Sequence, residues 1–124
     1  MKEIIDLRPP QERAILVGAP LKRGGAKHLA PEHLEELGRL ADTAGAIVVG
    51  ELTQQLDRPD SSTYIGSGKI EELKGLIAER EATVVIFDDE LTPAQGKNIE
   101  TALGTRVIDR AELILDIFAL RARS

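Results

Sequence analysis

A glycine-rich turn, Gly66-Ser67-Gly68-Lys69, is the first segment of this sequence whose residue types suggest a chemistry. A phosphate-binding P-loop has the pattern G-x-x-x-x-G-K followed by Ser or Thr, because its first glycine opens an anion nest and its hydroxyl holds magnesium. Here Thr63 replaces the first glycine and Ile70 follows the lysine, so the segment is not a P-loop. Two interpretations remain: a tight turn that enters a helix, or a helix N-terminus whose N–H groups and lysine bind a phosphate of RNA or of a nucleotide.

Three acidic residues, Asp88, Asp89 and Glu90, directly follow an apolar run. At the carboxyl end of a strand, where open α/β sheets place their ligands, paired carboxylates could hold Mg²⁺ through water. They could equally be solvated residues at the end of a strand, which we favour because no nucleophile, base or second ligand cluster accompanies them. His28 and His33 are five residues apart, whereas ligands on one helix face need a spacing of three or four. The residues alone therefore predict no complete catalytic site and no metal site.

Positive charge is concentrated in two places. Between residues 13 and 31 the sequence has basic residues and no acidic one, and after residue 116 its only charges are basic: Arg13, Lys22, Arg23, Lys27, Arg121 and Arg123. The first group surrounds a Gly24-Gly25 pair typical of a flexible loop. A polar segment at 51–62, long enough to be a functional loop, adds Arg58. These are either solvated loop and helix-end charges or a docking surface for an anionic partner.

Four short apolar runs must position these residues. Each is continuously apolar and most of its residues are β-branched, as in a strand that is buried on both faces. Amphipathic stretches of helical length alternate with the runs, which is the pattern of βαβ units. The sequence predicts an α/β fold, a small and mostly parallel sheet of about four strands flanked by helices in three layers. The expected strands are 14–17, 46–49, 84–87 and 107–108.

Start and stop signals place four helices between and after these strands. The first begins near Pro31 and ends at Gly45, and the second follows Gly68. Thr92-Pro93-Ala94-Gln95 is a capping box that begins the third, whose inward residues are Ile99, Ala102 and Leu103 and which ends at Gly104. The fourth starts at Asp109, carries Leu113, Ile114, Ile117, Phe118 and Leu120, and reaches the last residue without a stop signal. We therefore expect a fragment cut at a domain boundary, with an extension at 1–12 and one domain at 13–124.

Composition narrows the class of protein. The 124 residues carry a formal charge of −5 and are 42% hydrophobic and 30% charged, as in one globular domain. The absence of cysteine excludes a disulfide framework, a thiol nucleophile and a Cys-ligated metal. No apolar run has the length of a membrane span and the first residues lack a signal-peptide core, so we expect a cytoplasmic protein without a membrane partner. Few aromatic residues and overall acidity argue against base stacking and against a general polyanion binder such as a DNA-binding protein.

Several motifs, in the same order, resemble the N-terminal domain of the HflX family of ribosome-binding GTPases. The resemblance covers nearly the whole chain from about Arg13, with departures at Ser61, Gly96 and Leu120. The matching segments are Asp42-Thr-Ala-Gly-Ala46, Thr63-Tyr-Ile-Gly-Ser-Gly-Lys69 with Glu72-Leu73, Phe87-Asp-Asp-Glu-Leu-Thr-Pro-Ala-Gln95 with Asn98 and Glu100, Val107-Ile-Asp-Arg110, and Leu113-Ile-Leu-Asp-Ile-Phe-Ala119 with Arg121-Ala122-Arg123.

The resemblance implies a cytoplasmic parent that binds the large (50S) ribosomal subunit and splits or rescues stalled ribosomes under stress. Its α/β part would precede a helical hairpin and a P-loop GTPase domain, both absent here, which would hold GTP and Mg²⁺. This chain would then be no enzyme and hold no cofactor by itself, and its partners would be ribosomal RNA and the GTPase domain of the same parent.

Three hypotheses follow for the chain itself. In the first it binds ribosomal RNA through phosphate contacts, which position a protein without reading sequence, from Lys22, Arg23, Lys27, Arg58 and Lys69. In the second it binds or weakly hydrolyses ATP or GTP, with Gly66, Gly68 and Lys69 near phosphate and Asp88 or Asp89 near magnesium. In the third it is a regulatory domain that restrains the GTPase of its parent.

Overall fold

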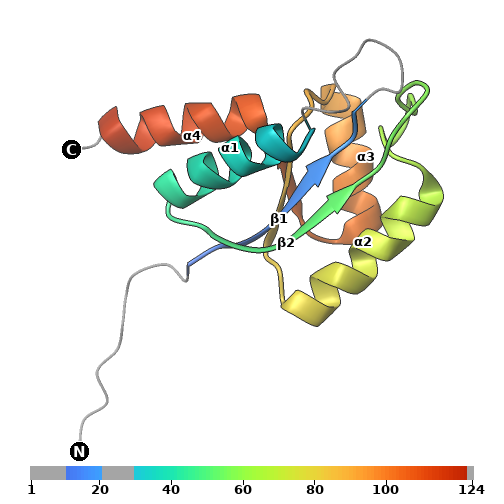
Figure 1. The fold of residues 1–124 in the computed structure, drawn as a ribbon, viewed down its shortest axis with the longest axis horizontal. Coiled ribbons are helices and arrows are strands. Elements are labelled where there is room, and N and C mark those ends of the chain that lie inside the picture. The colour runs from blue at the N-terminus through green and yellow to red at the C-terminus, as the bar shows by residue number, and fades with distance from the viewer. Residues whose placement is uncertain (1–10, 21–29, 123–124) are drawn as a thin grey trace, which may run out of the picture.

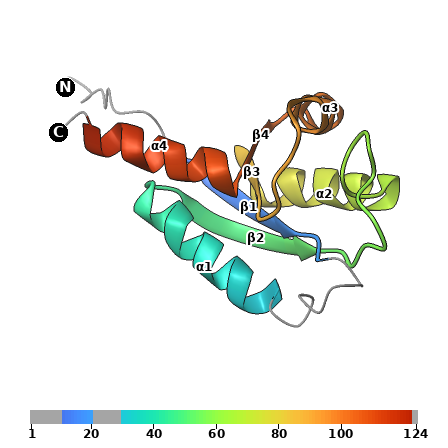
Figure 2. The ribbon, with the colours of Figure 1, turned by 90° about the horizontal axis from the view of Figure 1, so that it is seen from above.

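The computed structural model describes residues 11–20 and 30–122, and in this part of the chain four strands alternate with four helices. The order is β1 (Arg13–Gly18), α1 (Ala30–Thr43), β2 (Ile47–Thr53), α2 (Ser67–Arg80), β3 (Val84–Phe87), α3 (Pro93–Leu103), β4 (Arg106–Asp109) and α4 (Arg110–Ala122). All strand pairs are parallel and the order across the sheet is β2-β1-β3-β4. Figure 1 shows the ribbon, and Figure 2 labels all four strands. The predicted α/β fold is confirmed.

The helices cover both faces of the sheet and make three layers. Helices α1 and α4 contact each other, as do α2 and α3, and the two pairs lie apart in Figure 1. Side chains of β1 alternate between the two faces, with Ile15 and Val17 in one core and Ala14 and Leu16 in the other. A strand buried in this way must be apolar at every position, which is why its sequence does not alternate.

Several apolar residues are more exposed than their sequence pattern predicts. Ile47 and Val48 are 44% and 36% exposed because β2 is the edge strand of the sheet that residues 11–20 and 30–122 form. Ala102 is exposed rather than inward, since Ile99 and Leu103, four residues apart, form the face of α3 that meets the core. Phe118 is 63% exposed on α4.

The helix termini follow the local signals closely. In the capping box the Thr92 hydroxyl accepts from the Gln95 N–H at 3.1 Å, and the Gln95 side chain accepts from the Thr92 N–H at 3.0 Å. Gly104, at φ +68°, ends α3 in the left-handed conformation. Helix α2 begins at Ser67, slightly earlier than predicted, with Gly66 as its N-cap.

In the part of the chain that the structure describes, no helix has the length and apolar character needed to span a bilayer.

Candidate functional site

The carboxyl ends of β1 and β3 are the place where a sheet of this topology is expected to bind a ligand. These neighbouring strands diverge in their connections, because the chain goes from β1 to β2 on one side and from β3 to β4 on the other. Such a switch point is where open α/β sheets bind ligands. The connection from β2 to α2 leaves the same edge, as the arrow of β2 and the green segment beyond it show in Figure 2. We call this the carboxyl edge.

Asp88, the first residue after β3, joins three elements at the carboxyl edge. Its Oδ1 accepts from Nε of Arg110 at 2.9 Å and also from Nη2 of that residue. Its Oδ2 lies 3.5 Å from Nδ1 of His33 in the first turns of α1. Although burial lowers the pKa of Arg110, the hydrogen bonds and charges of Asp88 and Glu36 together outweigh this effect and raise the pKa above its usual value. With only 13% of its side chain exposed, Asp88 is a partly buried ion-pair partner rather than a solvated strand-end residue.

Arg110 has further partners on α1. Its Nη1 donates to Glu36 Oε1 at 2.9 Å, and its Nη2 donates to the carbonyl of His33 at 3.0 Å. One guanidinium at the start of α4 therefore ties the end of β3 to the start of α1. Sequence reasoning missed this role, because Arg110 is 22 residues from Asp88 and no local pattern joins them.

Asp89 joins a different pair of segments. Its Oδ2 accepts from the N–H of Ala19, directly after β1, at 2.9 Å, and its charge acts on the side chain of Tyr64. Burial and the neighbouring charge of Asp88 raise the pKa of Asp89 above its usual value, although its hydrogen bonds lower it. Burial, then the charge of Asp89, raise the pKa of Tyr64 to about 12. Tyr64 is the second residue that sequence reasoning missed.

The connection from β2 to α2 is a structured loop rather than a solvated tether. The Asp60 carboxylate accepts from the N–H groups of Ser62 and Thr63 at 2.7 and 3.0 Å, and these bonds lower the pKa of Asp60. Gln95 and Asn98 of α3 donate to the carbonyls of Asp60 and Ser62.

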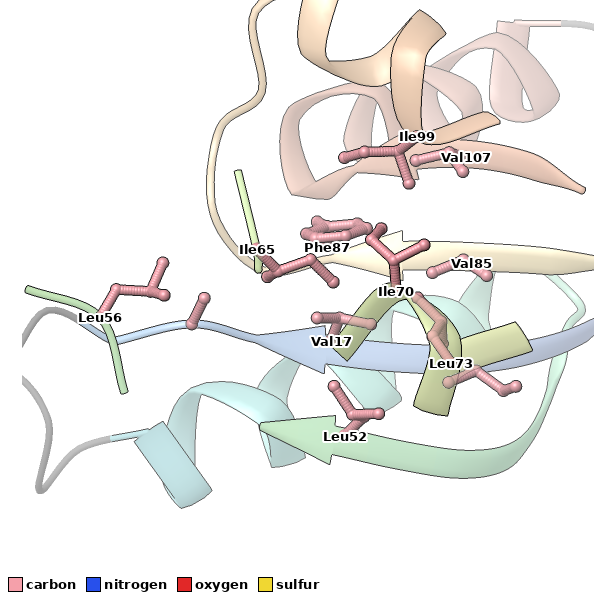
Figure 3. Packing of buried hydrophobic residues seen from close by; sticks show 12 residues of the cluster. Val17, Leu52, Leu56, Ile65, Ile70, Leu73, Val85, Phe87, Ile99 and Val107 are labelled. Carbon is pink, nitrogen blue, oxygen red and sulfur yellow. The ribbon is translucent and has the colours of Figure 1, made fainter. Parts of the chain in front are cut away.

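The apolar residues of this loop belong to the core. Leu56 and Ile65 are buried in it, and Ile65 lies beside Phe87 in Figure 3. The Tyr64 ring packs edge-on against Phe87, with 6.5 Å between the ring centroids. Arg58 is exposed on this loop.

The glycine turn lies at the start of α2, on the same edge of the sheet. The N–H of Gly66 donates to Gln54 Oε1 at 3.1 Å, and a Cβ added at Gly68 would meet no atom within 4 Å. Lys69 is paired with Glu72 at 2.9 Å and keeps 30% of its side chain exposed. Helix α2 has no side chain that caps its N-terminus.

Some of the remaining residues that the sequence singled out lie within the described part of the chain, and others lie outside it. Lys22, Arg23, Lys27 and His28 lie outside the described residues. Within the described residues, no three acidic or histidine side chains gather as ligands for a cation. The carboxylates of Asp88 and Asp89 are instead engaged with protein donors, so the geometry supports a scaffold for the edge loops more directly than a catalytic centre.

Comparisons with known proteins agree with this fold. Residues 31–119 match the family model described as "GTP-binding GTPase N-terminal". A GTPase HflX of Lacrimispora saccharolytica is 48% identical over 122 residues, which cover 98% of this chain and 28% of that protein. A GTPase HflX of Caldanaerobacter subterraneus is 49% identical over 119 residues, covering 96% and 27%.

A solved structure, SsGBP in complex with GDP, superposes with a TM-score of 0.67 at 26% identity, over 92% of this chain and 31% of that one. The chain thus spans less than a third of the length of these relatives, and its similarity to them extends over almost all of its own length. With the matching family model and the shared fold, this similarity shows that the chain belongs to the HflX family of GTPases and corresponds to their N-terminal domain.

Proposed function

We propose that this chain is the ribosome-facing domain of an HflX-type GTPase and docks on ribosomal RNA of the large subunit with its carboxyl edge. The observation that carries the proposal is topological. The candidate contact residues all belong to connections that leave this edge or to the helix turn that follows: Lys22, Arg23, Lys27, Arg58 and Lys69. Of these, Arg58 and Lys69 lie in the part of the chain that the structure describes, whereas Lys22, Arg23 and Lys27 fall in sequence between the end of β1 and the start of α1.

The charge balance of the carboxyl edge supports this orientation. Asp88 is paired with Arg110, Asp89 accepts from the N–H of Ala19, and Asp60 accepts from two backbone N–H groups. Because these carboxylates are held by protein donors, they oppose an approaching phosphate less than solvated carboxylates would. An acidic chain can in this way present a locally basic surface.

In the parent, this docking would bring a GTPase domain with its GTP and Mg²⁺ to stalled ribosomes in the cytoplasm during stress, where it would split or rescue them. The nucleotide chemistry would belong to that domain. The role of the present chain is to bind and orient.

Co-sedimentation of the chain with large ribosomal subunits tests the proposal. The double variant Lys22→Glu with Lys27→Glu should bind at least tenfold more weakly and reduce the salt slope of the binding constant by about 2, since each phosphate contact contributes roughly one. The control is Arg39→Glu with Lys74→Glu, which makes the same charge change at exposed helix positions. Equal losses in the two variants would contradict a specific docking edge.

Nucleotide binding is the second candidate, and it is favoured by the start of α2, where no side chain caps the helix and space is open around Gly68. Calorimetry with ATP and GTP separates it from the first. Binding at millimolar nucleotide that is lost in both Lys69→Ala and Asp89→Ala supports it, and the absence of heat rejects it. If the chain binds neither RNA nor nucleotide, the third role remains, restraint of the parent's GTPase, which deletion of the domain from the parent would test.

A further inference from the structure

The connection between β2 and α2, residues 54–66, is a compact loop whose two ends meet. At its base the N–H of Gly66 donates to Oε1 of Gln54 at 3.1 Å. Ile65 is fully buried in the core, whereas residues 57–62 are exposed. Loops with joined ends that are packed by their own side chains are frequently functional. We call this segment the β2–α2 loop.

Helix α3 holds the exposed part of the β2–α2 loop from one side, as Figure 2 shows for the green segment beyond β2. Nε2 of Gln95 donates to the carbonyl of Asp60 at 2.9 Å, and Gln95 is itself only 7% exposed. Nδ2 of Asn98 donates to the carbonyl of Ser62 at 3.0 Å and lies 3.3 Å from the hydroxyl oxygen of the same serine. The loop is therefore fixed to α3 at two carbonyls, in addition to its buried apolar anchor.

The two candidate RNA contacts within the described residues both belong to this arrangement. Arg58 is exposed on the loop, two residues before the Asp60 carbonyl that Gln95 holds. Lys69 lies in the first turn of α2, which begins directly after the loop closes at Gly66. The backbone that carries Arg58 is thus held in place by a helix that carries none of the candidate contacts.

We propose that Gln95 and Asn98 are positioning residues for RNA docking, which hold the β2–α2 loop in one conformation so that Arg58 meets the phosphate backbone without a prior ordering step. This inference rests on the proposed function and goes beyond it, because neither residue is among the contacts with RNA. Each acts through a carbonyl of the loop.

Positioning has a physical consequence for binding. A loop that is already ordered loses less conformational entropy when its side chains contact a ligand, so pre-organisation strengthens binding without adding a contact. Releasing the loop should therefore weaken binding while leaving the number of phosphate contacts, and hence the salt slope, unchanged.

Asn98→Ala tests this consequence without changing the charge of the chain. It removes both contacts with Ser62, and it keeps α3 because alanine is a stronger helix former than asparagine. We expect about fivefold weaker binding to large ribosomal subunits with an unchanged salt slope. The matched control is Thr101→Ala, an exposed position one turn further along α3, which should bind as the unmodified chain does.

A double-mutant cycle separates positioning from a general loss of stability. Arg58→Ala should weaken binding and lower the salt slope by about 1, as expected for the loss of one phosphate contact. In the Arg58→Ala background, Asn98→Ala should weaken binding little further, because the side chain that it positions is gone. Fully additive losses, or binding of Asn98→Ala equal to that of Thr101→Ala, overturn the proposal.

Gln95→Glu tests the other anchor. Glutamate in this position also completes a capping box, so the start of α3 is kept, but it offers no N–H to the Asp60 carbonyl. Amide hydrogen exchange of the free chain across 57–64 should be faster in Gln95→Glu and in Asn98→Ala than in Thr101→Ala. Exchange that is unaltered in both variants overturns the proposal.

These measurements distinguish failure of this proposal from failure of the proposed function. If the unmodified chain binds large subunits and Asn98→Ala binds equally well, only the positioning role fails. If the unmodified chain does not bind large subunits, the proposed function fails and the positioning role fails with it.

Discussion

Replacing Arg110 with methionine is predicted to destabilise the domain far more than its place at the start of a helix suggests. The guanidinium donates to Asp88, to Glu36 and to the carbonyl of His33. Methionine keeps an unbranched stem and removes every one of these donors. Asp88, whose side chain is only 13% exposed, then loses its guanidinium partner and keeps the 3.5 Å contact with Nδ1 of His33.

The magnitude follows from the partial burial of the pair. Breaking a fully buried ion pair costs about 3–5 kcal/mol, and exposed pairs contribute at most about 1 kcal/mol. The Arg110 side chain is 24% exposed and that of Asp88 13%, so we expect an intermediate loss of about 2 kcal/mol. For a domain of this size that lowers Tm by roughly 7 °C.

Thermal and urea unfolding followed by circular dichroism measure this loss. The matched control is Arg39→Met, which removes an exposed pair with Glu35 within one helix and should cost about 0.3 kcal/mol. Adding Asp88→Asn to Arg110→Met removes the stranded charge and should restore about 1 kcal/mol. If Arg110→Met and Arg39→Met unfold within about 0.5 kcal/mol of each other, the reasoning about the carboxyl edge is refuted.

Three other measurements address separate features. Tyr64 is the single tyrosine in a chain without tryptophan, so phenolate absorbance should report a midpoint near pH 12 instead of 10. Stability should fall between these pH values because the unfolded chain loses the proton first, and a midpoint at 10 in the folded chain would be inconsistent with a buried hydroxyl. Thr92→Ala should cost about 1 kcal/mol in urea unfolding by breaking the capping box, and a loss below about 0.3 kcal/mol would show that the cap contributes little. Gly104→Ala should destabilise the domain by about 1 kcal/mol because the φ of Gly104 is +68°. Gly96→Ala, inside α3 with open space around it, should stabilise the domain by up to about 1 kcal/mol. A free-energy change of the same sign in both variants would contradict the assigned backbone geometry.

Local sequence signals predicted the elements of the fold because each depends on neighbouring residues. The uniformly apolar run of β1 reflects burial on both faces, and the capping box at Thr92 is a contact over three residues. The same apolar pattern at Ile47 and Val48 was misleading, since the order of strands in the sheet, and not the run itself, decides which strand is an edge.

The candidate site was predictable only in part. Asp88 and Asp89 stood out as acidic residues at a strand end, but their interpretation depended on partners 22 and 25 residues away in sequence, Arg110 and Tyr64. Gln95 shows the same limit. Its capping role was readable, whereas its second bond, to the carbonyl of Asp60, spans 35 residues. Contacts between loops at the carboxyl edge are a product of topology and leave no periodic trace in the sequence.

Site-specific crosslinking tests the central claim most directly, because the chain has no cysteine and an introduced one is unique. Ser61→Cys places a photoreactive label on the exposed loop of the carboxyl edge. Glu79→Cys places it near the end of α2, where the Arg80 carbonyl accepts from Arg13 at the start of β1, on the opposite edge. Docking through the carboxyl edge predicts crosslinks to large-subunit RNA from Ser61→Cys and not from Glu79→Cys. Crosslinks from Glu79→Cys alone, or from neither position, would contradict it.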